Sequence, residues 1–396
     1  MEIFIIKVNI KAFKAKNGDA FLLNFENGQN ILIDMGMPET YQIEIKDDLL
    51  KLKNKNESID LLIISHIDED HIGGAIKFIQ DNQNGEIIQI KEIWHNSYKH
   101  IQFDKEKVKN IKQETKSILE SFIMKNMSNN INGIQDITCE HGSSLASLIH
   151  KYNYNWNSSF NHTVICTKDG TTKTEVTVGD IKFILLSPNK EKLTKLSTEW
   201  LYELQKEKYN FEISDEEIFD DAFEFHMKYE QDNSSLTSDI AASNIYDFEE
   251  LSTLSEKDKS ATNGSSISFI IEYKDKKLLF LGDAHEDIIY DNLLKLQDVG
   301  YELLFNLVKI PHHGSNKNIS NRLMALIRSD KFLISTNGTK HKHPNIEALA
   351  KIIVSNTDAK KEIIFNYDLD ISQELNNEEY KSKYNYDIKH LNEIEI

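Results

Sequence analysis

Short apolar runs separated by polar turns dominate both ends of this chain. In the first part, apolar or alternating runs occupy residues 4–8, 20–24, 30–34 and 60–64. Runs of this length with β-branched residues predict strands, and Asn17-Gly18 and Asn27-Gly28 are typical of the turns that join strands. The pattern therefore predicts a sheet in the first part of the chain.

The second part repeats this alternation and adds helices. Strands are predicted at residues 266–273, 277–281, 307–310 and 332–335, with helices starting near Glu286, Ser320 and Asn345. Between the two parts, the pattern predicts helices at 104–127 and 142–152 and a hairpin at 174–188 that turns at Asp180. The arrangement predicts an α/β fold of two packed sheets with helices outside.

Composition adds little to this picture except where it concerns location. The chain has 396 residues, which is enough for a sizeable core. No apolar stretch is long enough to span a membrane, and the first residues lack the pattern of a signal peptide. The 2 cysteines, Cys139 and Cys166, do not form a disulfide framework. We therefore expect a cytoplasmic protein without membrane contact.

The net charge of -18 is concentrated in one segment. Residues 199–258 contain 18 Asp and Glu against 4 Lys, a net of -14 that leaves -4 for the rest of the chain. We predict an acidic, mostly helical insertion there, able to bind a partner protein or a second copy of the chain. Because an acidic surface repels polyanions, the charge argues against avid, nonspecific DNA binding by this chain alone.

The most informative motif follows the strand predicted at residues 60–64. Four metal-ligand side chains occur within six residues there: His66, Asp68, Asp70 and His71. They do not share one face of a helix, but a short loop can direct all of them to one point. Imidazoles and carboxylates in this arrangement indicate one or two divalent cations.

Later strand ends carry further ligand candidates. Leu281-Gly282-Asp283 ends one strand, His312-His313-Gly314-Ser315 follows the next, and His343-Pro344 follows a third. Adjacent histidines after a buried strand are costly to hide without partners. A Gly-Asp pair alone is typical of turns, but together these motifs indicate one shared metal centre.

These motifs resemble a metallo-β-lactamase-fold hydrolase, in the branch that contains the hydrolase domain of the ComEC DNA-uptake protein and related stand-alone bacterial proteins, some of which occur beside anti-phage genes. The specific motifs are the loop from His66 to Gly74 and the His312-His313-Gly314-Ser315 element. The other matching segments, in chain order, are residues 17–20, 32–36, 185–188, 263–267, 281–283 and 343–344. The resemblance implies an α/β fold, an αββα sandwich of two packed mixed sheets with outer helices, formed by a single domain over residues 1–396.

Two departures from the wider family affect the expected metal. Asp68 stands where most zinc members carry histidine, and a harder oxygen ligand favours Mn²⁺ or Mg²⁺ over Zn²⁺. The usual mid-chain histidine is also not evident, because His141, His150 and His162 lie in no matching motif. We interpret these three as surface or structural residues, and expect one or two ions of Mn²⁺ or Zn²⁺, with Mg²⁺ as a further candidate.

The resemblance assigns roles to the candidate residues. His66 and Asp68 would favour one ion, Asp70 and His71 the other, and Asp283 would bridge them, with His312 or His313 completing the set. Asp34 would accept a hydrogen bond from a ligand histidine. The catalytic candidates are Asp70, His313 and His343. His343, Ser315 and whichever of His312 and His313 is not a ligand could protonate a leaving group or hold a phosphate.

The expected function is metal-dependent hydrolysis by a metal-activated water. A phosphodiesterase or nuclease, acting on nucleic acid or a nucleotide, fits the carboxylate-rich ligand set and the branch. A lactonase or other small-ester hydrolase would need the same residues. A diiron oxidoreductase of this fold would normally need a flavodoxin partner domain, which this sequence does not show. A regulatory or sensor subunit of a bacterial defence complex is the remaining alternative.

Overall fold

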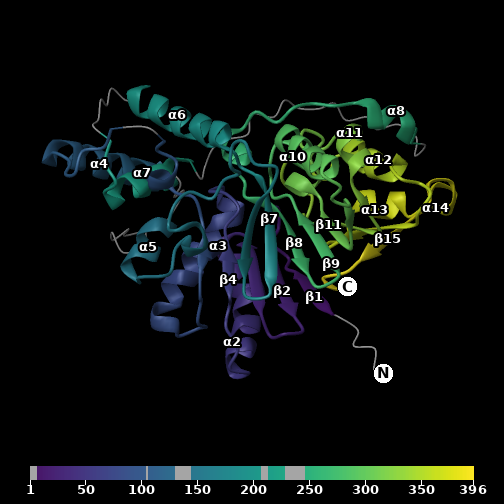
Figure 1. Cartoon of the computed structure of the whole chain (residues 1–396), viewed down its shortest axis with the longest axis horizontal. Coiled ribbons are helices and arrows are strands. Elements are labelled where there is room, and N and C mark those ends of the chain that lie inside the picture. The colour runs from purple at the N-terminus through teal and green to yellow at the C-terminus, as the bar shows by residue number, and fades with distance from the viewer. Residues whose placement is uncertain (1–6, 104–105, 130–143, 207–212, 228–245) are drawn as a thin grey trace.

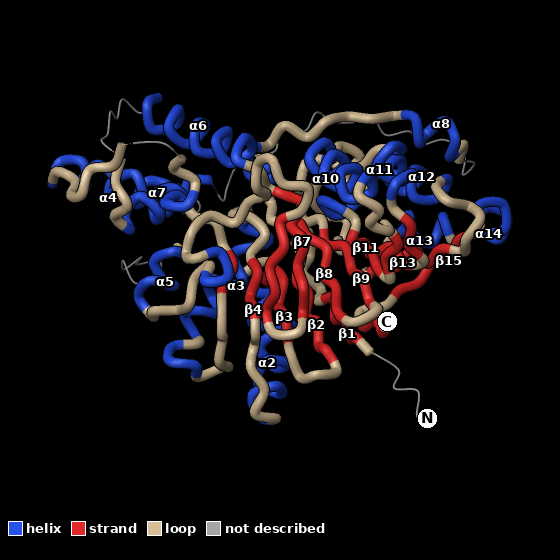
Figure 2. Tube along the Cα trace, viewed as in Figure 1, coloured by secondary structure: helices blue, strands red, loops and turns tan. Residues whose placement is uncertain are grey.

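Two β-sheets pack face to face and carry helices on their outer faces (Figures 1 and 2). The structure, a computed structural model, describes residues 7–103, 106–129, 144–206, 213–227 and 246–396. The predicted αββα sandwich of mixed sheets is confirmed. None of the helices in the described ranges is long and apolar enough to cross a membrane.

The first sheet has six strands and is built mostly from the start of the chain. Its order is β16 (Glu393–Glu395), β1 (Val8–Ala12), β2 (Ala20–Phe25), β3 (Asn30–Met35), β4 (Leu61–Ile63) and β5 (Ile93–Trp94). Strands β1, β2 and β3 are antiparallel neighbours, whereas β3, β4 and β5 are parallel. Pairing of β16 with β1 brings the two ends of the chain into one sheet.

The second sheet has eight strands. Its order is β15 (Tyr386–His390), β14 (Lys361–Phe365), β13 (Lys331–Ile334), β11 (Leu307–Lys309), β9 (Lys276–Phe280), β8 (Ser268–Tyr273), β7 (Ile181–Ser187) and β6 (Thr174–Val178). Strands β9, β11, β13, β14 and β15 are parallel, so their carboxyl ends lie at one edge. A separate parallel pair joins β10 (Leu304–Phe305) to β12 (Arg328–Ser329).

Three apolar layers hold the sandwich together. Alternate side chains of both sheets, such as Ile33, Phe183 and Phe280, are buried between the sheets. Helices α2 (Lys46–Asn54), α3 (Glu69–Asp81) and α5 (Leu145–Lys151) cover the outer face of the first sheet. The outer face of the second sheet is covered by α10 (Glu286–Asp298), α11 (Asn321–Leu326), α12 (Ile346–Val354), α13 (Asp370–Leu375) and α14 (Glu378–Tyr384), with α8 (Phe248–Thr253) packed on α12.

A fourth apolar cluster lies outside these layers and is helical. It joins α4 (Gln113–Asn129), α6 (Lys190–Lys206) and α7 (Glu217–Met227) through side chains that include Leu119, Trp200 and Phe223. The described part of the acidic segment 199–258 contributes the end of α6, then α7 and α8, and contains no named strand. The short helices α1 (Pro38–Thr40) and α9 (Ala261–Gly264) complete the described elements of this type.

Some predicted boundaries differ from the structure. The helix predicted from residue 104 begins at Gln113, because the backbone of Val108 bonds instead to Ile213 in a short bridge. The strand predicted at 4–8 lies mostly outside the described residues, and β1 begins at Val8. Cys139 and His141 also lie outside them, whereas Cys166 is partly buried and free of a disulfide.

Candidate metal centre

The loop after β4 is fixed by a carboxylate at the end of β3. Asp34 has a positive φ of 53°, and its two oxygens accept hydrogen bonds from the backbone nitrogen and the hydroxyl of Ser65, both at 2.7 Å. The Nδ1 atom of His71 lies 2.9 Å from Asp34 Oδ2, and Nδ1 of His66 lies 2.9 Å from Ser65 Oγ. Asp34 is therefore placed to orient the ring of His71.

The two adjacent histidines after β11 both adopt left-handed backbone conformations. The φ angles are 45° for His312 and 54° for His313, which is unfavourable for residues with a Cβ and is typical of functional sites. The Nδ1 of His312 lies 2.9 Å from the Asn318 side-chain oxygen, and that of His313 lies 2.9 Å from the Ser335 carbonyl oxygen. Each imidazole thus has an acceptor for an Nδ1 proton.

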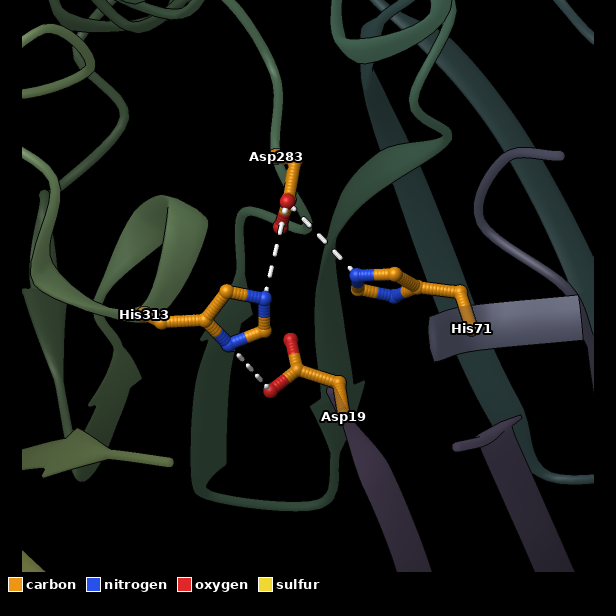
Figure 3. Close-up of side chains that lie close together, drawn as sticks. All are labelled: Asp19, His71, Asp283 and His313. Atoms are coloured by element: carbon orange, nitrogen blue, oxygen red, sulfur yellow. Dashed lines mark ion pairs between the residues drawn. The ribbon is translucent and has the colours of Figure 1, made fainter. Parts of the chain in front are cut away.

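The Nε2 atoms of four histidines face the carboxylate of Asp283: His66, His71, His312 and His313. Asp283 Oδ2 lies 3.5 Å from Nε2 of His71 and 3.7 Å from Nε2 of His313 (Figure 3). The corresponding distances are 3.7 Å for His312 and 4.0 Å for His66. His66, Asp283 and the two adjacent histidines follow the ends of β4, β9 and β11, whereas His71 lies in the first turn of α3.

Several of these buried atoms make no hydrogen bond among the described residues: Nε2 of His66, His71 and His313, and Oδ1 of Asp283. Buried polar atoms without partners are rare and costly. Imidazoles whose Nδ1 protons are held by acceptors present Nε2 lone pairs, which is the arrangement of metal-ligating histidines. The donor set therefore fits a divalent cation, and the cluster is able to bind one.

Charges within the cluster shift the pKa values of its members strongly. Burial alone would raise the pKa of Asp283, but the neighbouring His312, His71 and His313 outweigh it and hold this pKa well below its usual value. Burial would lower the pKa of His312, but Asp283 and Asp258 raise it to about 9. A bound cation would compete with protons for these ring nitrogens, since metal ligands bind in the deprotonated form.

Asp19 belongs to the cluster although the motif pattern did not single it out. One ligand atom each from Asp19, His71, Asp283 and His313 lie within 4.8 Å of one another, and all four residues are buried (Figure 3). Asp19 Oδ1 lies 3.4 Å from His313 Nδ1, and the other oxygen pairs with Lys309, which is 1% exposed. The turn residue before it, Gly18, approaches the metal loop so closely that a Cβ would meet the Asp70 carbonyl oxygen at 1.9 Å. The sequence showed the Asn17-Gly18 turn before Asp19, but not this contact with the metal loop.

The other candidate residues from the sequence are Asp68, Asp70, His343 and Ser315. Asp68 Oδ2 lies 3.4 Å from His66 Nε2, and Asp70 accepts a hydrogen bond from the Asn17 amide. His343 is 8% exposed, and its ring lies 5.2 Å from that of His312. The Ser315 hydroxyl accepts a hydrogen bond from the backbone of Lys317 within its own turn.

One supporting residue came from the segment that we interpreted as an acidic insertion. Asp258 Oδ2 lies 3.6 Å from His312 Nδ1 and accepts hydrogen bonds from Asn263 and Asn318. Its place among eighteen acidic residues concealed this role. The last residue of the segment therefore lies against the candidate centre.

The mid-chain histidines lie elsewhere. His150 and His162 line a separate cavity, none of whose lining residues belongs to the cluster around Asp283. His150 contacts Lys99, and His162 contacts the backbone of Trp156. Neither histidine belongs to the cluster around Asp283. The fourth member of that cluster, beside His71, Asp283 and His313, is Asp19.

Comparison with known proteins agrees with this architecture. Residues 14–143 match the model of the Metallo-beta-lactamase superfamily. Among curated proteins, none matches this sequence.

Solved structures give distant similarities. CmlA, a diiron beta-hydroxylase from Streptomyces venezuelae, is 9% identical with a TM-score of 0.39 over 98% of this chain and 54% of its own. The metallo-beta-lactamase fold protein YhfI from Bacillus subtilis is 10% identical with a TM-score of 0.38, over 98% and 100%. A long form RNase Z from yeast is 11% identical with a TM-score of 0.35, over 84% and 36%. The chain thus spans about half of the hydroxylase.

The match of residues 14–143 covers β2, β3 and β4, the metal loop and α3, and ends before the second sheet begins. The two packed mixed sheets and their outer helices extend the same architecture to the remainder of the described chain. The chain has the metallo-β-lactamase fold, with a buried Asp and His cluster able to bind metal.

Proposed function

We propose that this protein is a metal-dependent hydrolase of phosphodiester bonds. The observation that carries the proposal is the orientation of four imidazoles: each has an acceptor at Nδ1 and directs Nε2 toward Asp283. Ion pairs alone leave Nε2 of His66, His71 and His313 without a hydrogen bond among the described residues, which is costly for buried polar atoms. A metal centre explains the same arrangement without that cost.

The residues divide into two groups around Asp283. His71, His313 and Asp19 would hold one ion with it, and His66, Asp68 and His312 surround the position of a second. Divalent ions, when bound, supply Lewis acidity and lower the pKa of water. Asp70, which we expected to be a ligand, is held by Asn17 and is proposed here as an acceptor for a proton of the attacking water.

The leaving-group side of the site has its own candidate. His343 packs against His312, and neither ring nitrogen makes a hydrogen bond among the described residues. Burial, together with the charges of His312 and His313, keeps the pKa of His343 well below its usual value. The ring is therefore neutral near pH 7, and its N–H is available to a phosphate oxygen.

One feature favours a phosphodiester over a lactone. Asp19, Asp68 and Asp283 supply hard oxygen ligands, which suit Mn²⁺ or Mg²⁺, the usual ions of phosphodiester chemistry. The net charge of -18 favours a small phosphodiester, or nucleic acid delivered by a partner, over free duplex DNA.

The direct test measures hydrolysis of bis-p-nitrophenyl phosphate, single- and double-stranded DNA, RNA, a lactone and a thioester, each with Mn²⁺, Mg²⁺ and Zn²⁺. We expect phosphodiester cleavage with Mn²⁺, and a loss of at least about 100-fold in Asp283→Asn, since even the partners of ligands contribute that much. Asp291→Asn, on the exposed side of α10, is the matched control and should retain activity. Cleavage of the lactone or thioester without any phosphodiester cleavage would contradict the proposal.

A further inference from the structure

A second cavity lies apart from the metal centre, at α5 and the loop that follows it. Its volume is about 400 Å³, within the range of small-molecule sites. It is lined by Lys99, His100, Ile149, His150, Asn153, Tyr154, Asn155, Trp156 and His162. None of these residues belongs to the cluster around Asp283.

The charge of this lining is opposite to that of the protein as a whole. It contains one lysine and three histidines and no carboxylate, in a chain of net charge -18. The Lys99 ammonium lies 3.7 Å from the centre of the Trp156 ring and 3.1 Å from His150 Nε2. No carboxylate of the described residues forms an ion pair with it. A partly buried ammonium without a carboxylate partner is unusual.

The surrounding structure holds these groups in place. Trp156 donates its indole hydrogen to the His95 carbonyl oxygen at 2.8 Å, and the His95 ring stacks on it with the planes 10° apart. The backbone nitrogen of Lys99 donates to Asp220 of α7 at 2.9 Å. His95 in turn contacts Glu224 of α7 at 2.8 Å. The cavity wall is therefore anchored to the buried side of the acidic helix α7.

The cationic groups are left without full compensation. Burial lowers the pKa of Lys99, although Asp220 and other acidic residues of that region partly offset it. Burial, then the charge of Lys99, lowers the pKa of His100 and of His150, although Glu217, 4.0 Å from His150 Nδ1, partly offsets the effect at His150. A bound anion would relieve this unfavourable arrangement.

We propose that this cavity binds a small organic phosphate of about the size of a nucleoside monophosphate. The Lys99 ammonium and the Nε2–H of His100, whose Nδ1 accepts from the Ser97 backbone, are donors at one space, as the non-bridging oxygens of a phosphate require. His150 Nε2 accepts from Lys99 and so positions the ammonium. The Trp156 ring is already contacted by the Lys99 ammonium and by the stacked His95 ring, so recognition rests on the phosphate group rather than on stacking of a base. The site does not depend on the hydrolytic function proposed above.

The test uses the full-length protein after chelator treatment, so that AMP cannot bind through a metal. Isothermal titration with AMP should show one site, adenosine should not bind, and inorganic phosphate should compete with AMP. Lys99→Met should weaken AMP binding at least about tenfold, because it removes a charge-assisted contact. Lys151→Met is the control, because Lys151 is an exposed residue of α5 that does not line the cavity. The AMP affinity of this variant should stay within about twofold of that of the wild type.

Further variants distinguish loss of AMP binding from loss of the fold. His150→Gln gives a second reading if Lys99→Met does not fold, as judged by circular dichroism, and should also weaken AMP binding. Trp156→Phe should abolish the fluorescence change on AMP binding, because neither Trp94 nor Trp200 lines the cavity. Asp283→Asn should bind AMP as the wild type does. Absence of AMP binding to the metal-free wild type, or unchanged affinity in folded Lys99→Met, would overturn the proposal.

Discussion

The buried ion pair between Lys309 and Asp19 offers a quantitative test of the candidate centre. Both side chains are 1% exposed, and the pair links β11 of one sheet to the start of β2 in the other. Burial alone would raise the pKa of Asp19, but Lys309 and then His313 outweigh it and lower that pKa. Lys309→Met keeps the length of the side chain and removes its charge. The substitution therefore leaves an ionised carboxylate buried with His313 as its remaining partner.

The size of the effect follows from this burial. Removing one partner of a buried ion pair typically costs about 3–5 kcal/mol in the free energy of unfolding. Replacing both partners with uncharged residues is often nearly neutral, so Asp19→Asn combined with Lys309→Met should lie within about 2 kcal/mol of the wild type. The two substitutions should therefore be strongly non-additive.

Urea unfolding of the chelator-treated protein, followed by circular dichroism at pH 7, measures these free energies. Lys7→Met is the matched control, because Lys7 pairs with Glu395 at 2.9 Å and both side chains are about half exposed. That variant should lose less than about 1 kcal/mol. The reasoning is refuted if Lys309→Met costs less than about 1 kcal/mol, or if the double variant is as unstable as the single one.

Three further predictions concern groups near the centre and at α7. Asp34→Asn should leave the fold intact but weaken Mn²⁺ binding about 10–100-fold in a titration, because it no longer fixes His71; unchanged affinity would contradict this role. Gly18→Ala should lower the free energy of unfolding by about 3 kcal/mol, because its Cβ would lie 1.9 Å from a carbonyl oxygen of the metal loop; a neutral effect would show that the turn can move. Burial raises the pKa of Asp220 to about 7, above its unfolded value near 3.9, so this group makes the wild type more stable as the pH falls from about 7 toward about 4. Asp220→Asn should therefore stabilise the protein by about 1–3 kcal/mol at pH 8 and flatten that pH dependence, and a loss of stability at pH 8 would count against it.

The parts of the fold that the sequence predicted are those encoded locally. The runs that became β2, β3, β4, β8, β9, β11 and β13 are short, apolar and bounded by turns, so their pattern alone was sufficient. The metal loop was also recognisable, because its four ligand candidates occur within six residues. Helix α10 begins where the pattern placed it, at Glu286.

The parts that were missed depend on contacts between distant segments. Strand β16 is only Glu393–Glu395, polar at both ends, and forms by pairing with β1 from the other end of the chain. Asp19 is defined as a member of the cluster by Lys309 and His313, which reach it from the second sheet. No local pattern around Asp19 reports that pairing.

Composition concealed two other features. In the sequence, nothing distinguishes Asp258 from the other acidic residues of the segment 199–258, but in the structure it lies against His312. The histidines at positions 150 and 162 follow no motif, but the loop after α5 brings them together around Lys99. Both groupings are products of tertiary packing, and only the structure shows them.

The central claim is that the cluster around Asp283 is a divalent metal centre. Metal analysis by mass spectrometry, after incubation with Mn²⁺ or Zn²⁺ and removal of free ions, tests it directly. We predict one or two equivalents in the wild type and in His390→Ala, whose imidazole lies outside the cluster, and almost none in His71→Ala combined with His313→Ala. A wild type that retains neither ion, or undiminished metal in the folded double variant, would contradict the account.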